Sequence, residues 1–374
     1  MKKLISVFAV FAVLLASFSL KAYSVDLSQI SAKYAVLVDA TTGSVIYGKN
    51  EHQKASMAST TKIMTALILC EQADLNKEIT VTEAMVRVEG SSMGLLEGDR
   101  AHYKDLLYGL LLASGNDAAN AIALSIGGSF ENFADMMNER AKQIGMSNTN
   151  FVTPSGLDDE NHYTTAYDMA LLACEAMKNK DFADACSSKY AQLEYGNPPY
   201  KRTLRNHNKL LKLYDKCIGI KTGFTKKSGR CLVSCAEENG KKVIAVTLNA
   251  PDDWNDHIKL LDFGIQSLET RIVEYKSVLP DLKVVGSDSN LSVEVDKVEL
   301  SMLPCDFDKI TYNVCLPDVV FAPIKSGDVV GNVMTFVNGK EVAKLNCTAI
   351  DDINSNNNKL KRDFEFWFKR MFSA

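Results

Sequence analysis

Ser59 and Lys62 form the first pair of residues whose types and spacing suggest catalysis. They stand three positions apart in the segment Ala-Ser-Thr-Thr-Lys-Ile-Met-Thr-Ala, residues 58–66. If this segment starts a helix, the two side chains share one face, with roughly 5–6 Å between their Cβ atoms. A hydroxyl within reach of an amine is a nucleophile paired with its own base. The largely apolar run from Ile63 to Leu69 predicts a dry surrounding, which lowers the pKa of Lys62.

A serine and a lysine at this spacing occur in many helices as a capping residue and a solvated side chain, so the pair alone decides nothing. Two further groups of residues strengthen the catalytic interpretation. Ser114-Gly115-Asn116 offers a hydroxyl and an amide, and Lys221-Thr222-Gly223 offers a cation and a second hydroxyl. The first group also suits an ordinary turn, because Ser, Gly and Asn are common turn residues.

The order of the strands and helices expected around these groups predicts one antiparallel sheet covered by helices. An apolar helix ends just before Ser114-Gly115-Asn116 and another begins directly after it, so this group lies on a tight link. Lys221 falls in a strand expected over 217–224. Further strands are expected over 34–38, 45–47, 231–236 and 242–248, the last two joined by the turn signal Asn-Gly. Because strands come from both ends of this region, with helices between them, the expected fold class is α/β of the α+β kind.

Several local signals mark the limits of the helices and loops between these strands. Ser129 and Thr165 are predicted to cap the starts of two helices, and Gly145 is predicted to end the first of them. Residues 80–98 are expected to form a surface loop with a short strand, and residues 195–199 to be a break. A helix over 253–268 closes the region.

The composition is that of an ordinary globular chain. The 374 residues are 46% hydrophobic and 24% charged, and 42 basic against 46 acidic residues give a net charge of −4. This balance argues against nucleic acid as a partner. The five histidines form no ligand-spaced pair, so neither a metal nor another cofactor is expected. The nine cysteines lack Cys-x-x-Cys spacing and are interpreted mostly as small buried hydrophobic residues.

The N-terminus predicts export. Lys2 and Lys3 precede an apolar run that extends to Leu20, and Ala22-Tyr23-Ser24 suits a cleavage site. Residues 1–24 are therefore predicted to be a signal peptide, with an uncleaved anchor as the alternative.

The catalytic domain is assigned to residues 25–270. The C-terminal third has a different sequence pattern. Residues 271–350 have short alternating strands and are predicted to be a small all-β domain that serves as a spacer or interaction module. Residues 351–374 comprise a polar linker and an amphipathic helix with aromatic and basic residues on different faces. Such a helix favours a membrane interface, with docking on the protein body as the alternative. The protein is expected to be extracytoplasmic and peripherally attached to the outer face of the cytoplasmic membrane.

Ser-x-x-Lys, Ser-x-Asn and Lys-Thr-Gly occur here in the order found in penicillin-binding proteins and class A β-lactamases, with Ser-Gly-Asn in place of Ser-Asp-Asn. The wider sequence resembles the low-molecular-weight penicillin-binding proteins, which are serine-type D-Ala-D-Ala carboxypeptidases. Three stretches carry this resemblance, residues 57–66, 112–120 and 219–225. The order of signal peptide, catalytic domain, small β domain and amphipathic tail is also similar.

The resemblance implies a penicillin-binding/β-lactamase-like fold and removal of the terminal D-alanine from peptidoglycan stem pentapeptides. It implies that Ser59 attacks the peptide carbonyl and forms an acyl-enzyme, while Lys62 takes the hydroxyl proton. Ser114 then passes a proton to the leaving amine, and Asn116 holds Lys62 and the substrate backbone.

The resemblance also assigns the residues that hold the end of the substrate. Lys221 and Thr222 are expected to bind its terminal carboxylate, for which a cation and a hydroxyl are suitable donors. Gly223 lets the substrate lie close to the strand. The backbone N–H groups of Ser59 and Phe224 are expected to form the oxyanion hole.

One position departs from the family pattern. Relatives often carry Asn-Arg-Asn before the Lys-Thr-Gly strand, and the arginine helps seat the carboxylate. This chain has Asn206-His207-Asn208 instead. His207 could supply part of that binding if it is protonated, or none of it.

Three alternatives to the carboxypeptidase stay open. A β-lactamase needs a base for deacylation, and Asp158, Asp159 and Glu160 are candidates that also suit a solvated loop. A D,D-endopeptidase would use the same motifs on cross-links. A non-catalytic penicillin-binding sensor is disfavoured by the intact motifs. The expected partners are peptidoglycan stem peptides, with β-lactams as inhibitors, in cell wall biogenesis and the control of cell shape.

Overall fold

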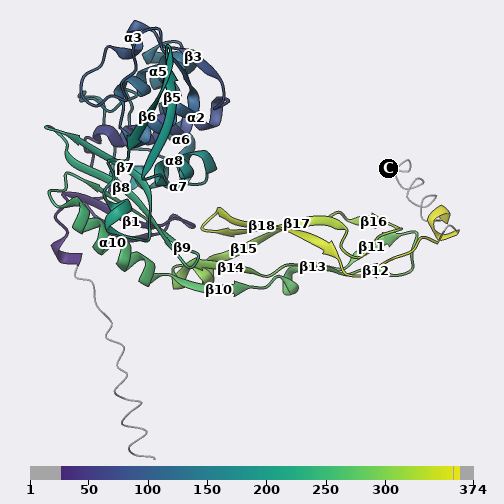
Figure 1. The fold of residues 1–374 in the computed structure, drawn as a ribbon. Coiled ribbons are helices and arrows are strands. Elements are labelled where there is room, and N and C mark those ends of the chain that lie inside the picture. Colours follow the sequence, from purple (N-terminus) through teal and green to yellow (C-terminus); the bar gives the residue numbers. More distant parts are fainter. Residues whose placement is uncertain (1–26, 357, 363–374) are drawn as a thin grey trace, which may run out of the picture. The chain divides into compact units, whose positions relative to one another are not determined.

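The computed structural model describes residues 27–356 and 358–362. The chain divides after Ile30 into two units, which are described separately. Of the first unit, only residues 27–30 are described, and they include the short 3-10 helix η1 (Leu27–Gln29). Figure 1 shows the helices and strands of the second unit, which has an α+β region (31–268) and a β region (269–353).

A five-stranded sheet with the order β2-β1-β9-β8-β7 forms the centre of the α+β region. All its neighbouring strands are antiparallel. The strands are β1 (Tyr34–Asp39), β2 (Val45–Lys49), β7 (Cys217–Thr225), β8 (Gly229–Glu238) and β9 (Lys241–Leu248). The prediction that strands from both ends of this region share one antiparallel sheet is confirmed. Asn239 and Gly240 have φ angles of 51° and 76°, the left-handed conformation that a tight hairpin turn requires.

The two faces of this sheet are covered by different helices. Ser234 of β8 and Thr247 of β9 contact His257 of α10 (Asp253–Ser267). Their neighbours in the chain, Val233 and Val246, belong instead to the large core shared with the other helices. Because successive side chains of a strand point to opposite faces, α10 covers one face and the remaining helices cover the other.

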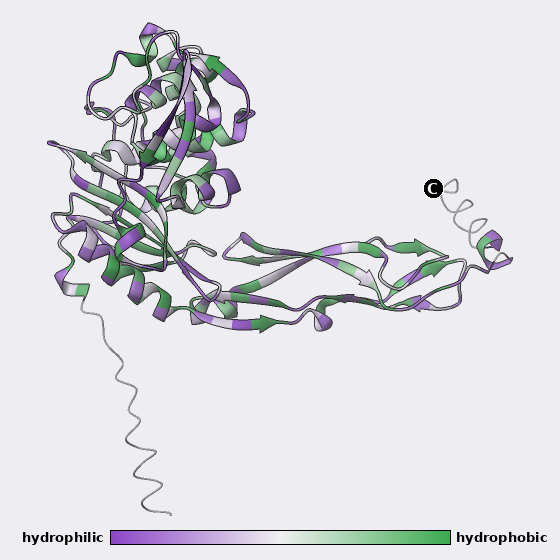
Figure 2. Ribbon diagram, in the orientation of Figure 1, coloured by the Kyte–Doolittle hydropathy of each residue, from purple (hydrophilic) through white to green (hydrophobic). Residues whose placement is uncertain are grey.

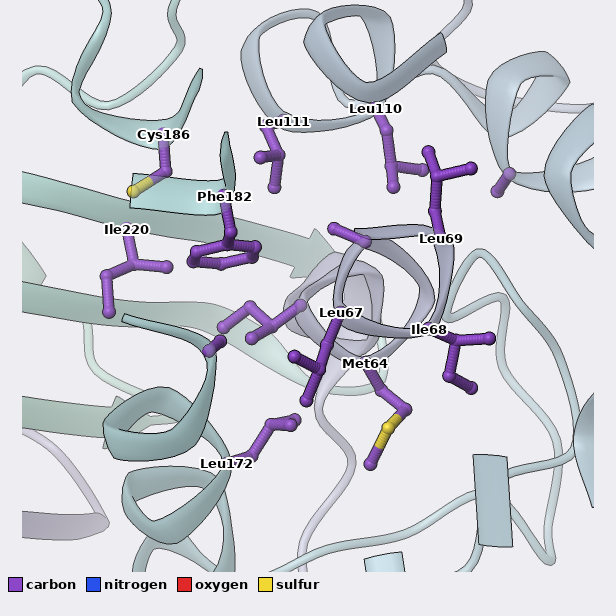
Figure 3. Close-up of a cluster of buried hydrophobic side chains, with 14 of the residues drawn as sticks. Met64, Leu67, Ile68, Leu69, Leu110, Leu111, Leu172, Phe182, Cys186 and Ile220 are labelled. Carbon is purple, nitrogen blue, oxygen red and sulfur yellow. The ribbon is translucent and has the colours of Figure 1, made fainter. Parts of the chain in front are cut away.

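The helical layer is built around α2, in which every residue from Lys62 to Leu69 is buried. A helix that is buried on all sides needs no polar face, which explains the apolar run after Lys62. In Figure 3, side chains of α2 are surrounded by side chains from α4, α7 and α8. The helices are α2 (Lys62–Gln72), α3 (Glu83–Val86), α4 (Tyr103–Leu112), α5 (Asn116–Gly127), α6 (Phe130–Ile144), α7 (Ala166–Ala176), α8 (Lys180–Ser187) and α9 (Leu210–Leu213).

The structure confirms the predicted limits of α6 and the predicted start of α7. The Ser129 side chain accepts a hydrogen bond from the Asn132 backbone at the start of α6, and Thr165 does the same for Asp168 at the start of α7. Gly145 ends α6 with a φ angle of 92°. These caps satisfy backbone groups that the ends of a helix leave unpaired.

Two predictions for the connecting segments are corrected. Residues 195–199 are not just a break, because they join β5 (Tyr190–Gly196) and β6 (Pro199–Arg205) into a hairpin. With β3 (Glu78–Thr80) and β4 (Arg100–His102), this hairpin makes a second sheet, of order β3-β4-β5-β6. Residues 80–98 are not wholly a surface loop, since Met85, Met93 and Leu95 are buried. Their irregular spacing gives no helical or strand period, so their burial escapes a pattern-based prediction.

The segment with Ser59 also differs from the prediction. Ser59 lies in a 3-10 turn, η2 (Ala58–Thr61), and the α-helix α2 begins only at Lys62. The tighter turn is closed by a hydrogen bond from the Thr60 backbone N–H to the Met57 oxygen. Single 3-10 turns are common at the ends of α-helices.

The β region forms two adjoining hydrophobic clusters, and the prediction that this part of the chain is all-β is confirmed apart from two short 3-10 turns. Figure 2 shows hydrophobic and hydrophilic residues mixed along its strands. Its elements are β10 (Glu269–Val273), η3 (Lys276–Val278), β11 (Leu282–Val285), β12 (Asn290–Leu291), β13 (Val293–Val295), β14 (Val298–Met302), η4 (Pro304–Lys309), β15 (Ile310–Cys315), β16 (Val319–Phe321), β17 (Val329–Val337) and β18 (Lys340–Ala349). The domain limits at 25–270 and 271–350 stay a prediction.

Some predictions concern residues that the structure does not describe. The signal peptide (1–24) lies outside the described residues, and so does most of the amphipathic tail (363–374). Within the described part, no helix combines the length and the apolar character needed to cross a bilayer. All nine cysteines are described, and each is a free thiol, six of them buried.

Candidate active site

Ser59 and Lys62 meet where η2 joins α2. The Lys62 Nζ lies 3.0 Å from the Ser59 Oγ, which is hydrogen-bonding distance. Ala58, directly before the serine, has a φ angle of 47°. A non-glycine residue rarely adopts this left-handed conformation, and such residues gather at functional sites.

Two carbonyl oxygens hold the amine of Lys62 in addition to Ser59. Its Nζ lies 2.7 Å from the Asn116 Oδ1 and 2.6 Å from the backbone oxygen of Ser155. A neutral amine has two N–H donors and one lone pair, and a carbonyl oxygen can only accept. When both N–H groups point at carbonyl oxygens, the lone pair is left for the Ser59 hydroxyl. This geometry suits a base that withdraws the Ser59 proton.

The surroundings of Lys62 disfavour its charged form. Burial lowers the pKa of Lys62 well below its ordinary value, and the charge of Lys221 lowers it further, while Asp117 opposes the shift. An amine with a lowered pKa carries a free lone pair at a pH where an exposed lysine would be protonated.

Ser114 and Asn116 lie on the link between α4 and α5, where the sequence places them. Ser114 is buried, has a φ angle of 57°, and its hydroxyl makes no hydrogen bond with the described residues. Asn116 starts α5, and its amide connects Lys62 to the backbone oxygen of Glu89. The amide orientation is therefore fixed from both ends, with the oxygen toward Lys62.

Asp117 organises the loop beside this link, and its sequence context does not mark it as a site residue. Its carboxylate accepts hydrogen bonds from the backbone N–H groups of Met93, Gly94 and Leu95 and from the Ser92 hydroxyl. These four hydrogen bonds hold the 92–95 segment against the start of α5. An acidic residue in the first turn of a helix is the only sequence signal for it, and that signal usually indicates favourable interaction with the helix dipole.

Lys221 is buried on β7, and its surroundings differ from those of Lys62. Its Nζ has one hydrogen bond within the described residues, to the backbone oxygen of Thr222 at 3.0 Å. Burial lowers the pKa of Lys221 to about 7. No carboxylate of the described residues pairs with it. Buried cations are normally paired, so this position favours an anionic ligand.

Gly223 brings β7 against the turn that carries Ser59. A Cβ atom at Gly223 would lie 3.0 Å from the Ser59 backbone nitrogen and 3.1 Å from the Met57 oxygen. Cβ contacts this short are uncommon, so a larger residue here would force β7 and the Ser59 turn to move apart by a few tenths of an ångström. The next residue, Phe224, is 66% exposed. The two residues predicted to form an oxyanion hole are thus brought together by the packing of β7 on η2.

His207 lies near Lys221, and its backbone N–H donates to the Leu112 oxygen. Desolvation and the Lys221 charge both lower the pKa of His207. His207 is therefore neutral at neutral pH and does not replace the permanent charge of an arginine.

Within the described residues, no hydrogen bond joins the three acids of the 158–160 loop to Ser59 or Lys62. The Asp158 Oδ1 accepts a hydrogen bond from the Thr225 hydroxyl at 2.9 Å. No carboxylate of the described residues is hydrogen-bonded to Ser59 or Lys62. The structure therefore gives no support to a deacylating base in this loop.

Comparisons with known proteins relate this chain to D-alanyl-D-alanine carboxypeptidases. A profile of D-alanyl-D-alanine carboxypeptidases matches residues 21–252, and a profile of the penicillin-binding protein 5 C-terminal domain matches residues 284–355. The D-alanyl-D-alanine carboxypeptidase DacF of Bacillus subtilis is 33% identical over 334 residues, which cover 86% of each chain. DacC of Escherichia coli is 29% identical over 387 residues, covering 94% of this chain and 92% of its own. The structure of penicillin-binding protein 5 from Haemophilus influenzae superimposes with a TM-score of 0.63 at 28% identity, covering 87% of this chain and 98% of its own.

Proposed function

The chain belongs to the D-alanyl-D-alanine carboxypeptidase family and is a D-alanyl-D-alanine carboxypeptidase, and we propose that it hydrolyses peptidoglycan stem peptides through an acyl-enzyme on Ser59. The observation that carries this proposal is the hydrogen bond of Ser59 to a buried lysine whose other neighbours are both acceptors. That arrangement supplies a nucleophile and a base without histidine or metal.

Acylation begins with Lys62 neutral. The Ser59 Oγ attacks the carbonyl carbon between the two terminal D-alanines while its proton moves to the Lys62 Nζ. The resulting ammonium then donates to Ser59, Asn116 and Ser155, so the charge forms where three acceptors already stand. The negative carbonyl oxygen lies toward the backbone N–H groups of Ser59 and Phe224.

Collapse of the tetrahedral intermediate breaks the peptide bond and leaves an ester on Ser59. The departing amine of D-alanine needs one proton. In this proposal, the Lys62 ammonium supplies it through the Ser114 hydroxyl, which donates its own proton to the amine and takes one from Lys62. Ser114 suits this relay because it is buried and makes no hydrogen bond within the described residues. Water then hydrolyses the ester, and Ser59 regains its proton.

Lys221 and Thr222 are proposed to bind the terminal carboxylate of the substrate. The buried amine of Lys221 lacks an anionic partner among the described residues, so the carboxylate would complete a charge-assisted hydrogen bond. Its negative charge would also raise the lowered pKa of Lys221 and keep that lysine protonated in the complex.

The same machinery would be acylated by penicillins, which makes β-lactams inhibitors of this enzyme. We further propose that the protein is exported and attached to the outer face of the cytoplasmic membrane through its C-terminal helix. The sequence of residues 360–372 supports this attachment, with aromatic and aliphatic residues at helical spacing on one face.

The proposed reaction is tested by D-alanine release from a peptide that ends in D-Ala-D-Ala. The protein without residues 1–24 and without its tail is compared with its Ser59→Ala variant. We expect release by the first and none by the second. A folded protein that releases no D-alanine would contradict the proposal, and turnover of a β-lactam would then favour the β-lactamase.

A further inference from the structure

His162 is a buried histidine beside the site that the mechanism above does not use. It is 4% exposed and comes from the segment between the 152–157 loop and α7. Its Nδ1 lies 2.9 Å from the backbone nitrogen of Val152 and 3.4 Å from that of Thr153. Its Nε2 lies 2.8 Å from the Thr61 hydroxyl. The ring therefore joins a loop on one side to the catalytic turn η2 on the other.

The hydrogen bonds around the ring fix its tautomer. A backbone N–H can only donate, so Nδ1 must be the acceptor and Nε2 must carry the proton. The Thr61 hydroxyl accepts from Nε2 and donates its own proton to the Ala58 oxygen at 2.8 Å. Burial lowers the pKa of His162 to about 4, although Asp158 and Asp159 oppose the shift, which agrees with a neutral ring.

The loop held by His162 is the one that carries the Ser155 oxygen to Lys62. This loop lies directly against η2, because a Cβ atom at Gly156 would come within 1.9 Å of the Ala58 oxygen. A second attachment runs from the Thr65 hydroxyl to the Pro154 oxygen at 2.6 Å. On the N-terminal side of these two points, the loop is held by the hydrogen bond from the Val152 backbone N–H to the Nδ1 of His162.

We propose that His162 is a positioning residue for the catalytic base, because it holds the 152–157 loop so that the Ser155 oxygen accepts one N–H of Lys62. The proposal rests on the proposed function, since it assumes that Lys62 deprotonates Ser59. If the loop moves away, one N–H of Lys62 loses its acceptor and the lone pair of the amine no longer has a fixed direction. Acylation then slows, while the groups that bind the substrate stay in place.

Two substitutions of His162 separate its two hydrogen-bonding arms. Asparagine places an amide oxygen near the Nδ1 position and keeps an acceptor for the Val152 N–H, whereas its contact with Thr61 is lost. Glutamine places its amide near the Nε2 position and keeps the contact with Thr61, whereas the acceptor for Val152 is lost. Because the Val152 arm holds the loop, His162→Gln is expected to impair Lys62 more than His162→Asn.

His257 offers a matched control. It is also fully buried, and its two ring nitrogens contact the Ser234 and Thr247 hydroxyls. It lies on α10, on the sheet face away from the helical layer, and contacts none of the proposed site residues. His257→Asn thus disturbs a buried, doubly bonded histidine without touching Lys62 or the 152–157 loop.

The experiment uses a chromogenic cephalosporin and stopped-flow kinetics to separate its non-covalent dissociation constant from the acylation rate constant. Thermal midpoints are recorded for each variant. For His162→Gln we expect an acylation rate constant reduced about 10- to 100-fold, with the dissociation constant changed less than about threefold. His162→Asn is expected to retain most of the rate, and His257→Asn all of it, whatever their thermal midpoints.

The possible failures are distinguishable. Acylation rates that follow thermal stability across all three variants, or that are equal in His162→Gln and His162→Asn, would overturn the positioning role and leave the proposed function intact. A wild-type protein that is folded but never acylated would overturn the proposed function, and this inference with it.

Discussion

The two buried lysines of the active site have opposite surroundings. Lys62 contacts three oxygen atoms, from Ser59, Asn116 and Ser155, all supplied by the protein. Among the described residues, the Lys221 amine is hydrogen-bonded to one oxygen, the backbone oxygen of the neighbouring Thr222. In the proposed mechanism, the base has its partners before substrate arrives, whereas the carboxylate-binding position gains its partner only from the ligand. Under this proposal, two equally buried lysines differ in role, one acting in catalysis and the other in substrate recognition, because their hydrogen-bonding partners differ.

The largest effect is expected from Lys62→Met, which removes the base and keeps a side chain of similar length. Acylation of Ser59 should fall by about 10³-fold or more, because no other described group can take the hydroxyl proton. Stability should be kept or improved, since burying an amine is costly. Acylation by a fluorescent penicillin and the thermal midpoint check both expectations. A near-normal rate would remove Lys62 from its proposed role.

Lys221→Gln tests the proposed role of Lys221 in binding the terminal carboxylate. A hydrogen bond to a charged group contributes about 1.5–3 kcal/mol, so kcat/KM for a peptide ending in D-Ala-D-Ala should fall about 10- to 100-fold. A peptide whose terminal carboxylate is amidated provides the control, because it has no charge to lose. An equal decrease in kcat/KM with both peptides would show that Lys221 contributes to the reaction steps and not to binding of the carboxylate.

The pH dependence should also differ between the two lysines. Lys62 must be neutral, so acylation rises as pH increases through its lowered pKa. Lys221 must be charged, and its pKa in the free protein is about 7, so binding of the carboxylate falls as pH rises above that value. The profile of kcat/KM for the carboxylate peptide should therefore fall by up to tenfold per pH unit on its alkaline side. The amidated peptide should lack that fall, and its presence there would contradict the assignment.

The smallest change is expected at His207, where relatives often carry arginine. Because the lowered pKa of His207 leaves it neutral, His207→Ala should alter KM for the carboxylate peptide less than about threefold. His207→Arg should lower that KM by about three- to tenfold by adding a permanent charge. A large loss in the alanine variant would show that the imidazole itself binds the substrate.

The sequence predicted the central sheet because its strands have strong local patterns, such as the Asn239-Gly240 turn and the apolar runs of β8 and β9. It indicated the three motifs of the proposed site because each is defined by a short fixed spacing along the chain. It did not predict the β5–β6 hairpin, because the Gly and Pro residues at its turn suggest only a break. Nor did it predict the role of the Ser155 backbone oxygen, because any residue type supplies one and only the folded loop brings it to Lys62.

The most direct test of the account is the location of the penicillin adduct. The protein is incubated with benzylpenicillin and digested, and the modified peptide is identified by mass spectrometry. The account predicts one adduct, on Ser59, that is absent from the Ser59→Ala variant. An adduct on Ser114 or on a cysteine, or one that persists in the variant, would contradict it.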